Sequence, residues 1–383
     1  MRKTKAPGAP HGAALLTAFF ALAASLMGAC QVFLGPEPDT GPQAVLKSLW
    51  NDFNETHAYI DIRMSYNRNF ESWDAVYEYY QKILMNRIPN QDSDRSGRYL
   101  FYICNDMLGE LMDPHISMFA PGGNFFWTAV DEIQKKEEAW FDIALIKGSY
   151  LKDRGFTRGV FFTYGRLNEP YNNIGYMYIS SFIDSDKLEQ KDWAHEIDNI
   201  LEFFREDSIK ALVIDIRGNS GGSGPVAEFI AARFASVQKN YMKASAKKGP
   251  GRNDFSDPMI FRVKPEGTRF TKYIALLTNK ATVSAAEWFV MALNTQSHVT
   301  HVGTTTRGAF SPKISRPMIN GWYYTISAFR VTDMDGRCFE GTGISPEPEF
   351  TFTGDADEGA AAGERKDIQL EKVLGEVGKW LNR

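Results

Sequence analysis

Hydrophobic and polar residues alternate with different periods along the chain, and the change of period divides it into regions. Within residues 44–118, apolar side chains recur at helical spacing, for example at Leu49 and Phe53. Residues 119–172 instead contain short apolar runs such as 159–164 (GVFFTY), which are typical of strands. The pattern therefore predicts a helical N-terminal subdomain followed by a β-rich connecting segment.

The rest of the chain, residues 173–383, alternates apolar strand-like runs with amphipathic helix-like runs. We expect strands at residues 174–182, 211–216, 273–278, 299–302 and 323–331, the last of them near a sheet edge. We expect helices at residues 188–204, 221–235, 284–293 and 367–381. Strands that alternate with helices pair in parallel through right-handed crossovers, so this pattern predicts an α/β core.

The N-terminus has the layout of a secretory signal. Positive residues near the start precede an apolar run over residues 13–27, which is shorter than the ~20 residues that span a bilayer. We therefore predict a signal peptide over residues 1–29 and an exported mature chain.

The end of this signal resembles a bacterial lipobox. Gly28 and Ala29 stand directly before Cys30, and the resemblance implies that Cys30 carries a lipid and that residues 30–43 form a tether. A plain cleaved signal is the alternative. Gln31, and not an acidic residue, directly follows the cysteine. An acidic residue there would be a signal for retention, so by analogy its absence favours the outer membrane.

Composition excludes several classes of function. The 383 residues include 43 Lys and Arg against 47 Asp and Glu, a net charge of −4, so nothing favours a nucleic-acid partner. Three cysteines exclude a disulfide scaffold, although Cys104 and Cys338 could form one disulfide or remain separate thiols. No cluster of His, Cys and Asp has metal-ligand spacing, so we expect neither a metal nor another cofactor.

Candidate chemistry lies at the ends of the predicted core strands. Residues 215–222 (DIRGNSGG) form a glycine-rich turn that can point backbone N–H groups into a cleft, but they lack the Lys-Ser/Thr of a phosphate loop. In residues 278–287 (TNKATVSAAE), Ser284 begins a helix directly after a strand and a turn. The helix N-terminus there favours a developing anion, although an ordinary N-cap serine is the alternative. Residues 303–309 (GTTTRGA) follow the next strand.

In this order and spacing, the three segments resemble the C-terminal-processing (tail-specific) serine peptidase family. Its fold, a spiral of βαβ units like that of ClpP and crotonase, also occurs in the tricorn protease core and in retinoid-binding repeats of the eye. The resemblance covers roughly residues 176–350 and implies that Ser284 is the nucleophile. It also implies an oxyanion hole made by the backbone N–H of Ala285 with that of Gly221 or Gly222.

The base that would activate the serine differs between branches of this family. The processing-peptidase branch uses a lysine at the position that Ala309 occupies here, and Lys313 lies four residues further on. The tricorn-like branch uses a histidine from the N-terminal subdomain. Residues 108–117 (LGELMDPHIS) resemble the helix end that carries it, so the resemblance implies that His115 is the general base.

A glutamate near the chain end completes the tricorn-like arrangement. Residues 339–347 (FEGTGISPE) resemble the closing segment of the family, in which Glu340 would orient His115 indirectly; a carboxylate at the rim of the site is the alternative. The segment between the helical part and the core has no clear PDZ domain, which many family members carry.

These features predict a lipid-anchored serine endopeptidase of the cell envelope, acting on proteins or peptides. The alternatives are a catalytically inactive protein on the same fold that binds an apolar or peptide ligand, and a structural envelope lipoprotein with a decayed site. The oligomeric state is left open.

Overall fold

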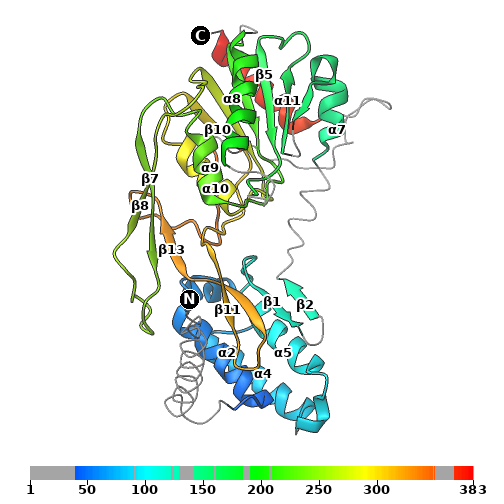
Figure 1. The fold of residues 1–383 in the computed structure, drawn as a ribbon, viewed down its shortest axis with the longest axis vertical. Helices are drawn as coiled ribbons and strands as arrows, with labels where there is room; N and C mark the ends of the chain where they lie inside the picture. The colour runs from blue at the N-terminus through cyan, green and yellow to red at the C-terminus, as the bar shows by residue number, and fades with distance from the viewer. Residues whose placement is uncertain are drawn as a thin grey trace, which may run out of the picture.

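The computed structural model places a helical unit beside an α/β core (Figure 1). It describes residues 39–89, 91–121, 125–128, 141–158, 161–183, 190–206, 209–347, 349 and 366–382. The predicted signal peptide, Cys30 and most of the tether lie outside these residues. Within the described residues, no helix has the length and apolar character needed to cross a membrane.

The helical unit is built from amphipathic helices whose apolar stripes meet in one core. Its helices are α2 (Pro42–Thr56), α3 (Ile60–Tyr66), α4 (Trp73–Arg87) and α5 (Arg98–Gly109), with a short 3-10 turn η1 (Gln91–Asp94) before the last. Ser72 caps α4 by accepting a hydrogen bond from the Ala75 N–H at 3.1 Å. Leu46 of α2, Val76 of α4 and Phe101 of α5 are buried in the same cluster.

A four-stranded antiparallel sheet completes this unit, with strand order β11-β12-β1-β2. Its strands are β1 (Ser117–Ala120), β2 (Phe125–Thr128), β11 (Lys313–Pro317) and β12 (Tyr323–Ser327). Met118, Tyr324 and Ile326 point from the sheet into the helical core. The hairpin of β11 and β12 therefore packs with the helical unit, which differs from the prediction that residues 173–383 form one unit.

The core is a mainly parallel sheet with strand order β10-β9-β6-β5-β4-β3. The strands are β3 (Phe156–Arg158), β4 (Phe162–Arg166), β5 (Ile174–Ile179), β6 (Ala211–Asp215), β9 (Tyr273–Thr278) and β10 (Val299–Gly303). β5, β6, β9 and β10 pair in parallel, and β4 and β3 add an antiparallel edge. The apolar runs without alternation, such as β9, are buried on both faces, as a covered parallel sheet requires.

Helices cover both faces of this sheet (Figure 1). α8 (Gln190–Glu206), α9 (Gly224–Ala231) and α10 (Ala285–Leu293) share one hydrophobic cluster with it, and α11 (Ile368–Leu381) packs in a separate cluster on the other face. Short turns α7 (Ile143–Leu145), η3 (Ile146–Tyr150) and η4 (Lys152–Arg154) precede β3. The expected fold class, a helical N-terminal region with an α/β core, is confirmed.

The predicted single strand over residues 323–331 is wrong. Ala328 separates β12 from β13 (Phe329–Thr332), which belongs to a different sheet with order β13-β7-β8. β7 (Lys239–Ala246) and β8 (Met259–Val263) were not expected; β8 contains a short apolar run, but most of its side chains are exposed. At Ala328 the chain passes from the helical unit to the core, which explains why a continuous alternating pattern forms two strands.

Candidate active site

Ser284 lies on a strained turn between β9 and α10. Its backbone has φ 64° and ψ −126°, a conformation that a residue with a side chain rarely adopts. An ordinary N-cap residue has β-region dihedral angles, so capping alone does not account for this geometry. The same strained strand-to-helix turn exposes the nucleophile of many serine hydrolases at the carboxyl edge of the sheet.

The glycine-rich turn after β6 fits directly against this serine. Gly221 has φ 86°, and a Cβ added to it would lie 2.7 Å from the Ser284 Cβ. The Gly221 N–H donates to Asn219 Oδ1 at 2.9 Å. The N–H groups of Gly222 and Ala285 donate to no acceptor among the described residues. Of the two glycines that the sequence left open, Gly222 therefore has the N–H that can join Ala285 in binding an oxyanion.

Glu287 fixes the third sequence segment to the start of α10. This fully buried carboxylate accepts hydrogen bonds from Thr306 Oγ1 at 2.7 Å, Gly308 N–H at 2.6 Å and Ala309 N–H at 2.9 Å. It also accepts from the Ser284 N–H at 3.1 Å. Burial raises its pKa, although these donors oppose the rise. Sequence reasoning missed Glu287, for which the spacing of Ser and Glu in a capping box was the available signal.

His115 lies in the loop between α5 and β1 and is 5% exposed. Its N–H donates to Asp113 Oδ1 at 2.9 Å, and its carbonyl accepts from Thr325 Oγ1 at 2.6 Å. The backbone is thus fixed, while the buried ring Nδ1 has no hydrogen-bond partner among the residues that the structure describes. Burial lowers the pKa of His115 to about 4, and the Lys313 charge adds to this against the opposing effect of Asp113. The imidazole is therefore neutral near pH 7 and can accept a proton.

A buried ionic cluster stands behind His115, and sequence reasoning did not predict it. Asp113 accepts from His57 Nε2 at 2.9 Å and lies 3.8 Å from the Arg63 guanidinium. Burial would raise the pKa of Asp113, but Arg63 and His57 lower it well below its usual range. Arg63 also forms an ion pair with Glu340.

Glu340 contacts Arg63 rather than His115. Its second oxygen accepts from the Phe310 N–H at 2.9 Å. Burial raises the pKa of Glu340 to about 7, although Arg63 opposes the rise. No hydrogen bond joins Glu340 to His115 in the described part of the chain, so any influence on the histidine passes through Arg63 and Asp113. Glu340 is nearly fully buried, which does not fit a carboxylate at the rim.

Gly308 is where the two halves of the candidate site meet. Its N–H donates to Glu287, which also holds Ser284, while its carbonyl accepts from Arg63 at 3.2 Å. Arg63 in turn contacts Asp113, which holds the His115 backbone. The structure therefore brings the surroundings of Ser284 and His115 together through two contacts on one residue.

The remaining sequence candidates fall outside this arrangement. Ala309 is buried at the position where the family lysine would stand, and Lys313 lies exposed on β11 in the sheet of the helical unit. Cys104 and Cys338 are both free thiols, so the disulfide alternative is wrong.

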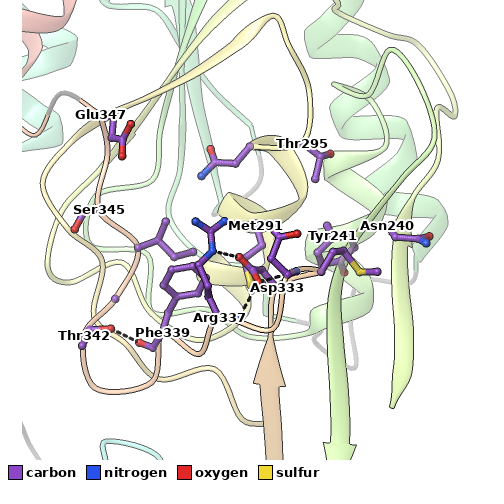
Figure 2. A pocket seen from close by; sticks show the side chains of 15 residues that line it. Asn240, Tyr241, Met291, Thr295, Asp333, Arg337, Phe339, Thr342, Ser345 and Glu347 are labelled. Atoms are coloured by element: carbon purple, nitrogen blue, oxygen red, sulfur yellow. Dashed lines mark hydrogen bonds and ion pairs between the residues drawn. The ribbon is translucent and has the colours of Figure 1, made fainter. Parts of the chain in front are cut away.

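A pocket of about 570 Å³ lies toward the C-terminal end of α10 (Figure 2), and Ser284 is not among the residues that line it. Met291 and Thr295 line it from the helix side, and Phe339 faces them from the closing segment. Asp333 and Arg337 form an ion pair at its wall. This mixed, partly charged lining gives little support to the alternative of an apolar ligand.

The fold and the strained serine turn place the core among serine peptidase-like folds, and the comparison with known proteins agrees. Residues 173–350, somewhat less than half of the chain, match the model for peptidase family S41. The carboxy-terminal processing protease CtpA of Bacillus subtilis (strain 168) is 27% identical over 176 residues, which are 46% of this chain and 34% of CtpA. The chain thus spans about a third of the length of this curated relative.

Solved structures extend the likeness beyond the core. A candidate peptidase from Parabacteroides merdae has a TM-score of 0.70 and 25% identity, over 88% of this chain and 97% of that protein. Mature CPAF, in a complex with lactacystin, has a TM-score of 0.61 at 12% identity, over 89% of this chain and 98% of that protein. The likeness to CPAF shows the fold alone, and it includes the helical unit.

Proposed function

We propose that the chain is a serine endopeptidase in which Ser284 attacks the peptide carbonyl and His115 acts as the general base. The observation that carries this proposal is the strained backbone of Ser284 at the N-terminus of α10, packed against a glycine that admits no side chain. Ground-state strain of this kind is retained where it serves a function. The match of residues 173–350 to peptidase family S41 supports the reaction class.

The proposed reaction is acyl transfer. His115 removes the proton of the Ser284 hydroxyl as the oxygen bonds to the carbonyl carbon, and the resulting oxyanion receives hydrogen bonds from the Ala285 and Gly222 N–H groups. His115 then gives the proton to the leaving amine. Water deprotonated by His115 attacks the acyl-enzyme, and the proton returns to Ser284.

Glu340 acts at a distance in this proposal. Its ion pair with Arg63 holds the guanidinium between Gly308 and Asp113, and Asp113 fixes the backbone of His115. The use of a histidine and a glutamate, with Ala309 in place of a lysine, supports assignment to the tricorn-like branch of the family.

The location of the protein is also a proposal. The N-terminal sequence, ending in Gly28-Ala29-Cys30, supports an exported lipoprotein anchored at Cys30, in the outer membrane by analogy with Gln31 at the next position. Metabolic labelling with an alkynyl fatty acid tests it, because Cys30→Ser would abolish the label. A labelled Cys30→Ser variant would contradict the anchor.

Comparison of the wild type with Ser284→Ala tests the catalytic proposal. Both proteins are incubated with unfolded casein and with a fluorophosphonate probe, which phosphonylates activated serines by forming a phosphorus–oxygen bond and expelling fluoride. We expect cleavage and labelling of the wild type alone, and loss of both in His115→Ala. A folded wild type that neither labels nor cleaves would refute the proposal and favour a binding protein on the same fold.

A further inference from the structure

One face of the sheet in the helical unit is exposed to solvent over part of its length. Residues directly opposite each other on neighbouring strands point to the same side of a sheet. Phe119 of β1 lies opposite both Tyr323 of β12 and Phe126 of β2, and Tyr323 lies opposite Pro317 of β11. These four side chains form one row across the whole sheet, which we call the aromatic row.

The aromatic row is accessible, although the other face of the same strands is core. Phe119 is 42% exposed, Phe126 is 66% exposed and Tyr323 is 47% exposed. Their neighbours along the strands, Met118 and Tyr324, are 1% and 2% exposed and pack against the helices. Three aromatic side chains that lie directly opposite one another on adjacent strands therefore face solvent as one group. Exposed apolar residues in soluble proteins are more often scattered singly.

The same face leads to His115. Two residues along the strands from Phe119 and Tyr323, on the side of His115, the hydroxyl groups Ser117 Oγ and Thr325 Oγ1 are 2.8 Å apart. Thr325 Oγ1 donates to the His115 carbonyl at 2.6 Å. Four positions along the chain separate His115, in the turn before β1, from Phe119, which is a span of at most about 13 Å at ~3.3 Å per residue. The aromatic row thus lies on the same strands whose Ser117 and Thr325 contact the His115 segment.

The exposed area indicates the kind of occupant. At ~200 Å² for each ring, the three aromatic side chains present roughly 300 Å² to solvent. A stable protein dimer buries ~800 Å² on each partner, so the row alone is too small for a second copy of the chain. An extended segment of a few residues is of matching size.

We propose that the aromatic row binds apolar side chains of an extended polypeptide substrate, about four residues away from the bond that Ser284 cleaves. This inference rests on the proposed peptidase function and deepens it by naming the substrate class. Unfolded chains with an aromatic or aliphatic group at this distance bind through the row. Peptides too short to span ~13 Å bind without it.

The test measures binding without catalysis. Fluorescein-labelled unfolded casein is titrated with full-length Ser284→Ala protein, and its fluorescence polarisation gives the Kd. Phe119→Thr and Phe126→Thr are then added together, since threonine is accepted in strands. The matched control adds Tyr99→Gln and Tyr102→Gln, which replace aromatic residues of similar exposure on α5. Melting curves confirm that each variant is folded, and Phe126→Thr alone is used if the double change lowers Tm strongly.

We expect the Kd for casein to rise about tenfold or more in the aromatic-row variant and less than twofold in the control. A folded aromatic-row variant with a Kd within twofold of its parent would overturn the proposal. An equal loss in the control would also overturn it, because casein would then bind to exposed aromatic residues in general. Fluorophosphonate labelling of the wild type tests Ser284 separately, so failure of the nucleophile and failure of the aromatic row are distinguishable.

Discussion

Replacement of Arg63 by methionine should destabilise the protein through two carboxylates that it leaves behind. The Arg63 side chain is 6% exposed, and those of Glu340 and Asp113 are 0% exposed. At an effective dielectric constant near 20, the attraction between unit charges 3.8 Å apart is about 4 kcal/mol. Removal of one partner from a buried ion pair typically costs ~3–5 kcal/mol. We therefore expect Arg63→Met to lower the free energy of unfolding by about 4 kcal/mol at pH 8.

The pH dependence of this loss follows from Glu340. Its pKa is already raised to about 7 by burial against the opposing effect of Arg63, and removal of Arg63 raises it further. A carboxyl whose pKa is higher in the folded state than in the unfolded state stabilises the fold more as the pH falls. The loss in Arg63→Met should therefore shrink between pH 8 and pH 5.5, because the folded variant then holds Glu340 protonated.

Urea unfolding followed by tryptophan fluorescence measures both effects. The double variant Arg63→Met/Glu340→Gln keeps an oxygen for the Phe310 N–H without the charge, so it should recover at least ~2 kcal/mol relative to Arg63→Met at pH 8. A loss below ~1 kcal/mol in the single variant, or an equal loss at both pH values, would show that the Arg63 charge does not hold these carboxylates.

Three further predictions concern the surroundings of Ser284 and His115. Glu287→Gln should lower the free energy of unfolding by ~2–3 kcal/mol in urea titrations, because the amide NH₂ would face a site that contains only donors; a loss under ~0.5 kcal/mol would contradict this. Gly221→Ala should reduce fluorophosphonate labelling at least ~100-fold in folded protein, since the new Cβ would lie 2.7 Å from that of Ser284, and labelling at the wild-type rate would argue against the packing. The acid limb of kcat/KM for casein-derived peptides should have an apparent pKa near 4, because burial favours the neutral imidazole of His115; an acid limb near 6.5 would indicate an exposed base.

Local signals in the sequence were sufficient for most of the core. The apolar run of β9 and the Ser284 turn are specified within a few residues, and residues 273–278 are confirmed as a strand with the predicted bounds. The β11–β12 hairpin was assigned to the wrong unit, because an alternating pattern shows that one face is buried but not against which element. Likewise, the sequence around Arg63 and Asp113 gives no sign of their ion pair, or of the ion pair that Arg63 forms with the distant Glu340.

The placement of the β11–β12 hairpin has a consequence for the order of synthesis. The helices α2 to α5 leave the ribosome long before Lys313, yet Tyr324 and Ile326 of β12 are part of their core. Until those strands arrive, the helices lack one wall of that core, and their apolar faces are open to water or to a chaperone.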